Sequence, residues 1–260
     1  IGDVGDDMNG LAQRVDFMRH HVDVTHLRAM KDQVTTYCIC ISDEETNGRS
    51  FLPLRLPNRA MLPDTINMEY LLSAKYLLLD TNAPITRKAA TAMLEKGGEV
   101  MFDCSLYSKE QEEMLRYSSI YIASEFYYQD RYGADSDIYA CCRDMMKQGP
   151  HTVIFTLGAR GCAGVGPDGP FSIPAFPLER VVDTTGAGDT FHGAYIVGLE
   201  RGLSAQESAR WASATSAFKC CAIGGRAGQP TADVVEKFLK TGEMDLRYIP
   251  ERVEYYSQLH

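Results

Sequence analysis

From residue 76 onwards, the spacing of apolar and polar positions predicts strands and helices in alternation. Strand-like runs occur at residues 76–80, 100–103, 120–123 and 152–157. Segments with helical spacing lie between them, at residues 85–97, 109–117 and 136–147. Such alternation favours a parallel sheet covered by helices.

The chain before residue 76 has a different pattern of apolar and polar residues. Residues 7–21 carry apolar side chains at helical spacing: Met8, Leu11, Ala12, Val15 and Met18. Residues 35–56 then form short β-rich runs around a turn at residues 45–49. Asn47-Gly48 between two such runs is a hairpin signal.

Two further helices are predicted near the end of the chain. Ser204 and Glu207 have the spacing of a capping box, which predicts the start of an Ala-rich helix running to about Cys221. Another helix is predicted over residues 231–240, with Gly242 as its stop.

A glycine-rich turn precedes one more predicted helix, in the segment Asp-Thr-Thr-Gly-Ala-Gly-Asp-Thr-Phe at residues 183–191. Gly202 is its predicted stop, and its apolar or small residues follow one helical face: Phe191, Ala194, Tyr195, Gly198 and Leu199. The turn lacks the third glycine of a dinucleotide fingerprint and the Gly-Lys-Ser/Thr of a P-loop.

The start of this helix has the chemistry of an anion site. Backbone N–H groups at a helix N-terminus are unpaired and lie at the positive end of the helix dipole. Asp189, in the first turn, is able to accept a proton from an attacking hydroxyl group. An anion cradle with a base is what phosphoryl transfer to an alcohol requires. The simpler alternative is an ordinary tight turn in which Asp189 is only a favourable N-terminal charge.

Composition limits the class of protein. A length of 260 residues, 45% hydrophobic and 23% charged, is ordinary for one large globular domain. A net charge of −9 argues against a nucleic-acid partner. The eight cysteines lack metal-site spacing and indicate reduced thiols of a cytoplasmic protein. No apolar run is long enough for a membrane span.

Several motifs in one order carry a resemblance to a known family. Residues 183–191 resemble the C-terminal signature of the PfkB (ribokinase-like) carbohydrate kinases, and residues 156–161 resemble their Thr-x-Gly-x-x-Gly nucleotide loop. Residues 1–10 and 21–25 resemble two earlier segments of the family. The resemblance implies a single ribokinase-like α/β domain over residues 1–260, with a mostly parallel sheet covered by helices on both faces. A small β lid, partly missing, would lie at approximately residues 33–58.

The resemblance also implies roles for individual residues. Asp189 would be the base, and Gly186, Ala187 and Gly188 would donate N–H groups to the transferring phosphoryl group. The nucleotide would be held by Thr156, Gly158, Gly161, Gly225 and Ser213. Asp183 and Thr185 match positions that bind a monovalent cation such as K⁺ through backbone carbonyls in many members.

The chain departs from the family pattern in three places. The family's Asn-x-x-Glu, associated with Mg²⁺, aligns with residues 124–127, so Tyr127 holds the glutamate position and Glu125 is the adjacent substitute. Asp103 stands in an incomplete form of another family motif and is expected to be a structural acid at a strand end. The family's opening strand has no counterpart, so several tens of N-terminal residues are expected to be absent.

These observations together predict an ATP- and Mg²⁺-dependent kinase that phosphorylates a primary hydroxyl of a sugar. Fructose, ribose and keto-deoxy sugars remain open as acceptors, and a nucleoside kinase is the enzymatic alternative. A non-catalytic relative that binds nucleotide is the alternative from another class. The resemblance to the family also suggests a homodimer formed through the lid. Neither nucleic acid nor a membrane is expected as a partner.

Overall fold

The structure is a computed structural model that describes residues 1–42, 49–53 and 65–258. The chain divides into two compact units, residues 1–73 and residues 74–258, and each is described by itself. That residues 1–260 form a single domain stays a prediction.

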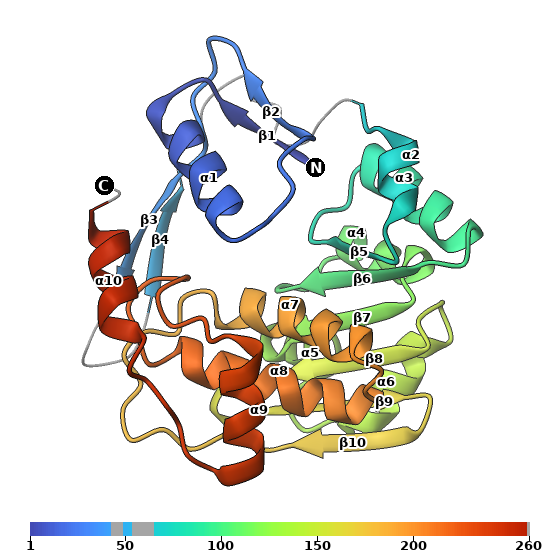
Figure 1. Ribbon diagram of the computed structural model, residues 1–260. Coiled ribbons are helices and arrows are strands. Elements are labelled where there is room, and N and C mark those ends of the chain that lie inside the picture. The colour runs from blue at the N-terminus through green and yellow to red at the C-terminus, as the bar shows by residue number, and fades with distance from the viewer. Residues whose placement is uncertain (43–48, 54–64, 259–260) are drawn as a thin grey trace. The chain divides into compact units, whose positions relative to one another are not determined.

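A six-stranded sheet forms the centre of the larger unit (Figure 1). Its strands in chain order are β5 (Tyr76–Leu79), β6 (Glu99–Cys104), β7 (Ile120–Ser124), β8 (Thr152–Thr156), β9 (Cys162–Gly166) and β10 (Gly169–Ile173). They lie side by side in the order β10-β9-β8-β7-β6-β5. The first four pair in parallel, and β9 and β10 join as antiparallel strands. The four strands predicted between residues 76 and 157 are therefore confirmed, each within one residue at its ends.

Helices cover both faces of this sheet (Figure 1). The helices of the larger unit are α3 (Pro84–Glu95), α4 (Lys109–Glu112), α5 (Glu125–Tyr132), α6 (Ile138–Met146), α7 (Ala187–Glu200), α8 (Ala205–Lys219), α9 (Ala232–Thr241) and α10 (Ile249–Ser257). The predicted helix at 109–117 is divided: α4 is followed by a 3₁₀ turn, η1 (Glu113–Tyr117). The prediction of a helix-covered, mostly parallel sheet is confirmed.

The alternation of side chains along each strand produces two separate cores. In β7, Ile120 and Ile122 face α7, α8 and α9, whereas Tyr121 and Ala123 face α5, α6 and η1. Each of these four side chains is at most 1% exposed. A central strand buried on both faces fixes the register of the sheet, because a one-residue shift would exchange the two cores.

The predicted signals at helix ends have the expected geometry. The backbone N–H of Glu207 donates to Ser204 Oγ at 3.2 Å, and the N–H of Ser204 donates to the Glu207 carboxylate at 2.9 Å. This capping box begins α8. Gly242 follows α9 in the left-handed conformation, with φ 77°.

The smaller unit contains a β-α-β arrangement and a hairpin. Strand β1 (Gly2–Gly5) leads to α1 (Met8–Arg19) and then to β2 (Leu27–Met30), which pairs with β1 in parallel. Strands β3 (Cys38–Ser42) and β4 (Arg49–Pro53) pair antiparallel, and α2 (Met68–Ser73) ends the unit. The strands of the predicted hairpin are therefore confirmed, whereas its Asn47-Gly48 turn and part of the predicted lid lie outside the described residues.

Helix α1 forms where residues 7–21 predict it, but its apolar stripe is not buried. Met8, Leu11, Val15 and Met18 are exposed, whereas Gly10 and Asp16 are buried. The start of α1 is held by Asp7, whose carboxylate accepts from the N–H of Gly10 at 2.9 Å and from the hydroxyl of Thr35 at 2.6 Å. Helical spacing therefore identified the element but not the face that is covered.

Candidate active site

The turn before α7 requires glycine at its centre. Gly186 caps the helix with φ 75° and ψ 8°, which is left-handed backbone. A β-carbon at this position would lie 3.1 Å from Cα of Gly225. Gly186 therefore lets the chain reverse into α7, and it brings the turn against the loop that contains Gly225.

Asp189 lies in the first turn of α7 and is exposed. Its carboxylate is close to the turn, since Oδ2 lies 3.7 Å from where a β-carbon of Gly186 would be. The predicted base is therefore accessible and stands beside the predicted anion site.

The three amides predicted to bind a phosphoryl group differ in their present contacts. The N–H of Ala187 donates to the carbonyl of Thr184 at 3.1 Å, which closes the turn. The amides of Gly186 and Gly188 belong to the same turn, and they are the remaining predicted donors to an anion. From α8, the hydroxyl of Ser216 donates to the carbonyl of Ala187 at 3.0 Å and fixes the turn against that helix.

Asp183 organises the segment that leads into the turn. Its Oδ1 accepts from the N–H of Thr185 and its Oδ2 from the N–H of Gly224, both at 2.8 Å. Burial acts to raise the pKa of Asp183, but these hydrogen bonds and the charge of Lys219 hold it below its ordinary value. Asp183 is 7% exposed, and its carboxylate holds the 183–186 segment to the loop after α8.

Sequence reasoning did not assign a role to His192. This buried side chain lies on α7, with Nδ1 2.6 Å from the carbonyl oxygen of Gly188 and 3.3 Å from Oδ2 of Asp103. Its Nε2 is buried and has no hydrogen-bond partner among the described residues. His192 therefore connects the first turn of α7 to the end of β6. A single histidine in an apolar helix gives no sequence signal of such a contact.

Asp103 is more than an isolated strand-end acid. Burial raises its pKa, the charge of His192 opposes that effect, and the nearby carboxylates of Asp189 and Asp80 raise it further. Three segments of the chain thus place acidic groups together at the carboxyl edge of the sheet, where ligands of such sheets bind.

The loop after β8 forms a compact turn at the same edge of the sheet. Thr156 ends the strand, and a short 3₁₀ turn follows at Gly158–Arg160. Gly158 and Gly161 both have positive φ, at 56° and 90°. A β-carbon on Gly161 would lie 2.0 Å from the carbonyl oxygen of Ile173, so this glycine is needed for packing against the end of β10.

Glu125 joins this loop to the end of β7. Ser124 caps α5, and the carboxylate of Glu125 forms an ion pair with Arg160 at 3.0 Å. Tyr127, at the position where the family pattern has glutamate, is fully buried. Glu125 is therefore the acid of this segment that is placed beside the predicted nucleotide loop.

The structure places Ser213, another predicted nucleotide contact, on α8, and that role stays a prediction. It lies on the buried face of α8, 9% exposed, with its hydroxyl 3.8 Å from the thiol of Cys162. Helical spacing turns this residue toward β9, because its neighbours on the same face fill the core.

Metal-binding groups are sparse. In the described ranges, no cluster of three or more His, Cys, Asp or Glu side chains is arranged to hold a metal ion. In the same ranges, no helix is long and apolar enough to cross a membrane.

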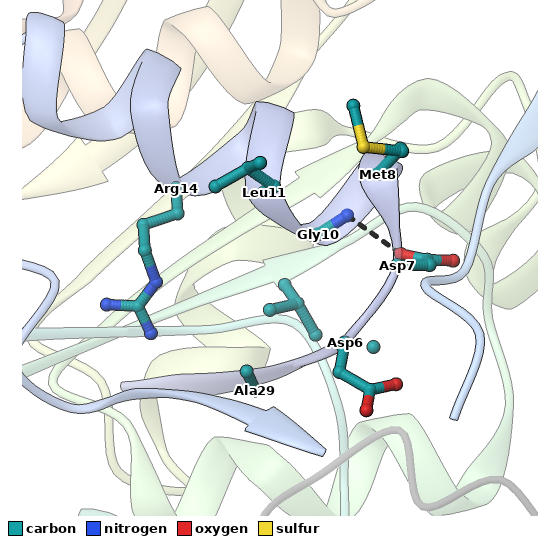
Figure 2. Close-up of a pocket in the computed structure, with 9 residues that line it drawn as sticks. Asp6, Asp7, Met8, Gly10, Leu11, Arg14 and Ala29 are labelled. Atoms are coloured by element: carbon teal, nitrogen blue, oxygen red, sulfur yellow. Dashed lines mark hydrogen bonds between the residues drawn. The ribbon is translucent and has the colours of Figure 1, made fainter. Parts of the chain in front are cut away.

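The smaller unit has a separate hollow of about 620 Å³, lined by residues 4–8, 10, 11, 14 and 29 (Figure 2). Figure 2 shows Asp7 bonded to the N–H of Gly10 at the start of α1, and Arg14 further along the same helix. Arg14 donates to the carbonyls of Val24 and Leu27. These polar groups hold the β-α-β arrangement together, and no residue predicted for the active site lines the hollow.

The chain is similar to known carbohydrate kinases over most of its length. A sequence profile described as "pfkB family carbohydrate kinase" matches residues 1–232. Aminoimidazole riboside kinase of Salmonella typhimurium is 32% identical over 93% of this chain and 82% of that protein. A shorter match to ribokinase of Bacillus subtilis is 37% identical and covers 35% of this chain but only 30% of that protein.

Solved structures share the fold. A ribokinase II of E. coli in complex with ATP and Mg²⁺ superposes with a TM-score of 0.77. It is 20% identical in sequence, and the match covers 92% of this chain and 82% of the other.

Proposed function

The chain belongs to the pfkB family of carbohydrate kinases, and from this we propose that it transfers the γ-phosphate of ATP to a hydroxyl group of a sugar or a sugar-containing compound. The observation that carries the proposal is the position of Asp189, an exposed carboxylate directly after the left-handed turn at Gly186. A base and an anion site then occupy the first turn of one helix.

The proposed reaction is an in-line displacement at phosphorus. Asp189 takes the proton of the acceptor hydroxyl as the acceptor oxygen bonds to the γ-phosphorus. The bond from that phosphorus to the β–γ bridging oxygen breaks, and ADP leaves. The amides of Gly186 and Gly188 donate to the transferring oxygens, and one such donor contributes about 3–4 kcal/mol in comparable oxyanion sites.

The nucleotide would lie along the carboxyl edge of the sheet. Thr156, Gly158 and Gly161 belong to one loop there, and Gly225 is in contact distance of the Gly186 turn. Gly158 leaves space for a phosphate, because the nearest atom to a β-carbon built on it is Glu125 Oε1 at 3.9 Å.

Magnesium would be held chiefly by the phosphates of ATP, since the described residues offer no cluster of acids for it. Glu125 fits a contact through water: it is partly exposed, beside the nucleotide loop, and already balanced by Arg160. When bound, Mg²⁺ neutralises charge that develops on the phosphate oxygens.

The acceptor class is supported by the relatives. An aminoimidazole riboside kinase and a ribokinase both act on a ribose-containing compound by name. We infer a sugar or nucleoside with a free primary hydroxyl, and nucleoside kinase activity remains part of the same proposal.

We also propose that β3 and β4 form a lid that pairs with a second copy of the chain. Apolar side chains are more than half exposed on both strands: Ile39, Ile41 and Leu52. A two-stranded hairpin alone is marginally stable, so partners for these side chains are expected. A Leu52→Glu variant should shift a sedimentation profile from dimer to monomer; a monomeric wild-type protein would contradict this.

The function is tested by supplying ATP and Mg²⁺ with a panel of sugars and nucleosides and measuring ADP release, using the natural full-length protein. Release with one acceptor, together with a phosphorylated product, identifies the substrate. Thermal stabilisation by ATP without ADP release for any acceptor would reject the kinase and support a nucleotide-binding protein.

A further inference from the structure

Lys219, the last residue of α8, is fully buried. Its Nζ donates to the carbonyl oxygen of Asp183 at 2.6 Å. Lysine is almost never fully buried without a counter-charge, because removing its ammonium group from water is costly. Here the Asp183 carboxylate interacts with it electrostatically and supplies that charge.

The ammonium lies where two segments meet under the anion site. The N–H groups of Val182 and Asp183 donate to the carbonyl of Cys220, directly after Lys219. The N–H of Gly224 closes the other side of the loop on Asp183. Lys219 thus fastens the segment that enters the Gly186 turn to the loop that passes beside it.

This arrangement does not fit a separate monovalent ion on Asp183. The carbonyl oxygen of Asp183, one of two predicted ligands, accepts from the Lys219 ammonium. Both carboxylate oxygens of Asp183 accept from backbone amides. An ammonium and K⁺ carry the same charge, so a further cation in contact with these atoms would be repelled.

We infer that the Lys219 ammonium takes the place of the predicted monovalent cation, so that the anion turn is organised without a bound ion. The expected effect on catalysis rests on the proposed function, because the organised turn is the proposed phosphoryl site. The expected effects on stability and on nucleotide binding do not depend on turnover.

The test compares wild-type protein in K⁺ with the same protein in tetramethylammonium, an ion too large for a carbonyl site, at equal ionic strength. Unfolding midpoint, ATP affinity by calorimetry and, where an acceptor is known, turnover are expected to agree within about twofold. A gain of about tenfold or more in ATP affinity with K⁺ would overturn the inference.

A Lys219→Met variant retains the apolar length of the side chain but removes its charge. It should bind ATP weakly in tetramethylammonium and regain affinity in K⁺ or NH₄⁺, a response that a purely structural lysine would not show. Lys147→Met is the matched control, because Lys147 follows helix α6 but is exposed. Identical behaviour of the two variants in every salt would overturn the inference.

The outcomes remain separable. If Lys219→Met does not fold, the wild-type salt comparison decides alone. If no acceptor is phosphorylated in any salt, the proposed function fails, while ATP affinity and unfolding midpoint still decide whether K⁺ is needed.

Discussion

The two segments on either side of Gly186 each contain an aspartate, but the fold surrounds them differently. Asp183, before the turn, is buried, accepts from two backbone amides and lies beside the Lys219 ammonium. Asp189, after the turn, is exposed at the start of α7. An acid whose oxygens are all bonded is suited to holding a loop, whereas an exposed acid at the start of a helix is suited to moving a proton. We therefore propose that the same residue type serves structure in one segment and chemistry in the next.

The largest expected effect is on the exposed acid. Asp189→Asn should lower turnover by about 10²–10⁴-fold, because a positioned base contributes that much. Its unfolding midpoint should stay at the wild-type value, since the side chain is exposed. Steady-state rates and thermal unfolding measure both, with Asp168→Asn as control: Asp168 is also exposed but lies in the turn between β9 and β10.

The buried acid should show the opposite response. Asp183→Asn should destabilise the fold by about 3 kcal/mol, because it leaves the Lys219 ammonium without its counter-charge. Since the pKa of Asp183 is lowered in the folded state, its stabilising contribution is present above its unfolded pKa and is lost as pH falls through the folded value. Urea unfolding as a function of pH should therefore show a loss on acidification that is smaller in the variant.

A substitution of His192 should have an intermediate effect, because this side chain contacts the carbonyl of Gly188 next to the turn. His192→Phe removes the bond to the Gly188 carbonyl and the contact with Asp103. A loss of about 1–2 kcal/mol in transition-state stabilisation, about tenfold in kcat, is expected. His192→Asn retains a donor and should recover part of kcat, with the KM for ATP little changed in either variant. Equal kcat for Phe and Asn would contradict a positioning role.

The smallest effect is expected at the N-terminal cap of α8, which lies outside the Gly186 turn. Ser204→Ala removes the hydroxyl that accepts from the N–H of Glu207. The free energy of unfolding should fall by about 1 kcal/mol. Chemical denaturation measures the loss, and kcat should not change; a loss of activity as large as that of His192→Phe would mean that global stability, not the turn, limits turnover.

Sequence patterns identified those features whose causes are local. The strands at residues 76–157, the capping box of Ser204 and the glycine turn at Gly186 follow from apolar runs, cap chemistry and backbone conformation. The family signature added the candidate roles of Asp189 and Gly225.

The features that sequence patterns missed depend on contacts between distant segments. His192 meets Asp103 from another element, and Lys219 meets Asp183 across the turn. The same limit applies to α1: helical spacing predicted the helix, but Met8 and Leu11 proved exposed, because periodicity does not say what covers a face. Ser213 was assigned to the nucleotide by resemblance, and its packing against Cys162 emerged only from the fold.

The most direct test measures a single turnover of bound ATP and acceptor in Asp189→Asn and Asp183→Asn side by side, with both substrates saturating and both proteins folded. The account predicts that Asp189→Asn binds ATP normally but transfers the phosphoryl group at least about a hundredfold more slowly than Asp183→Asn. Transfer by Asp189→Asn at the wild-type rate would contradict the assignment of this carboxylate as the base.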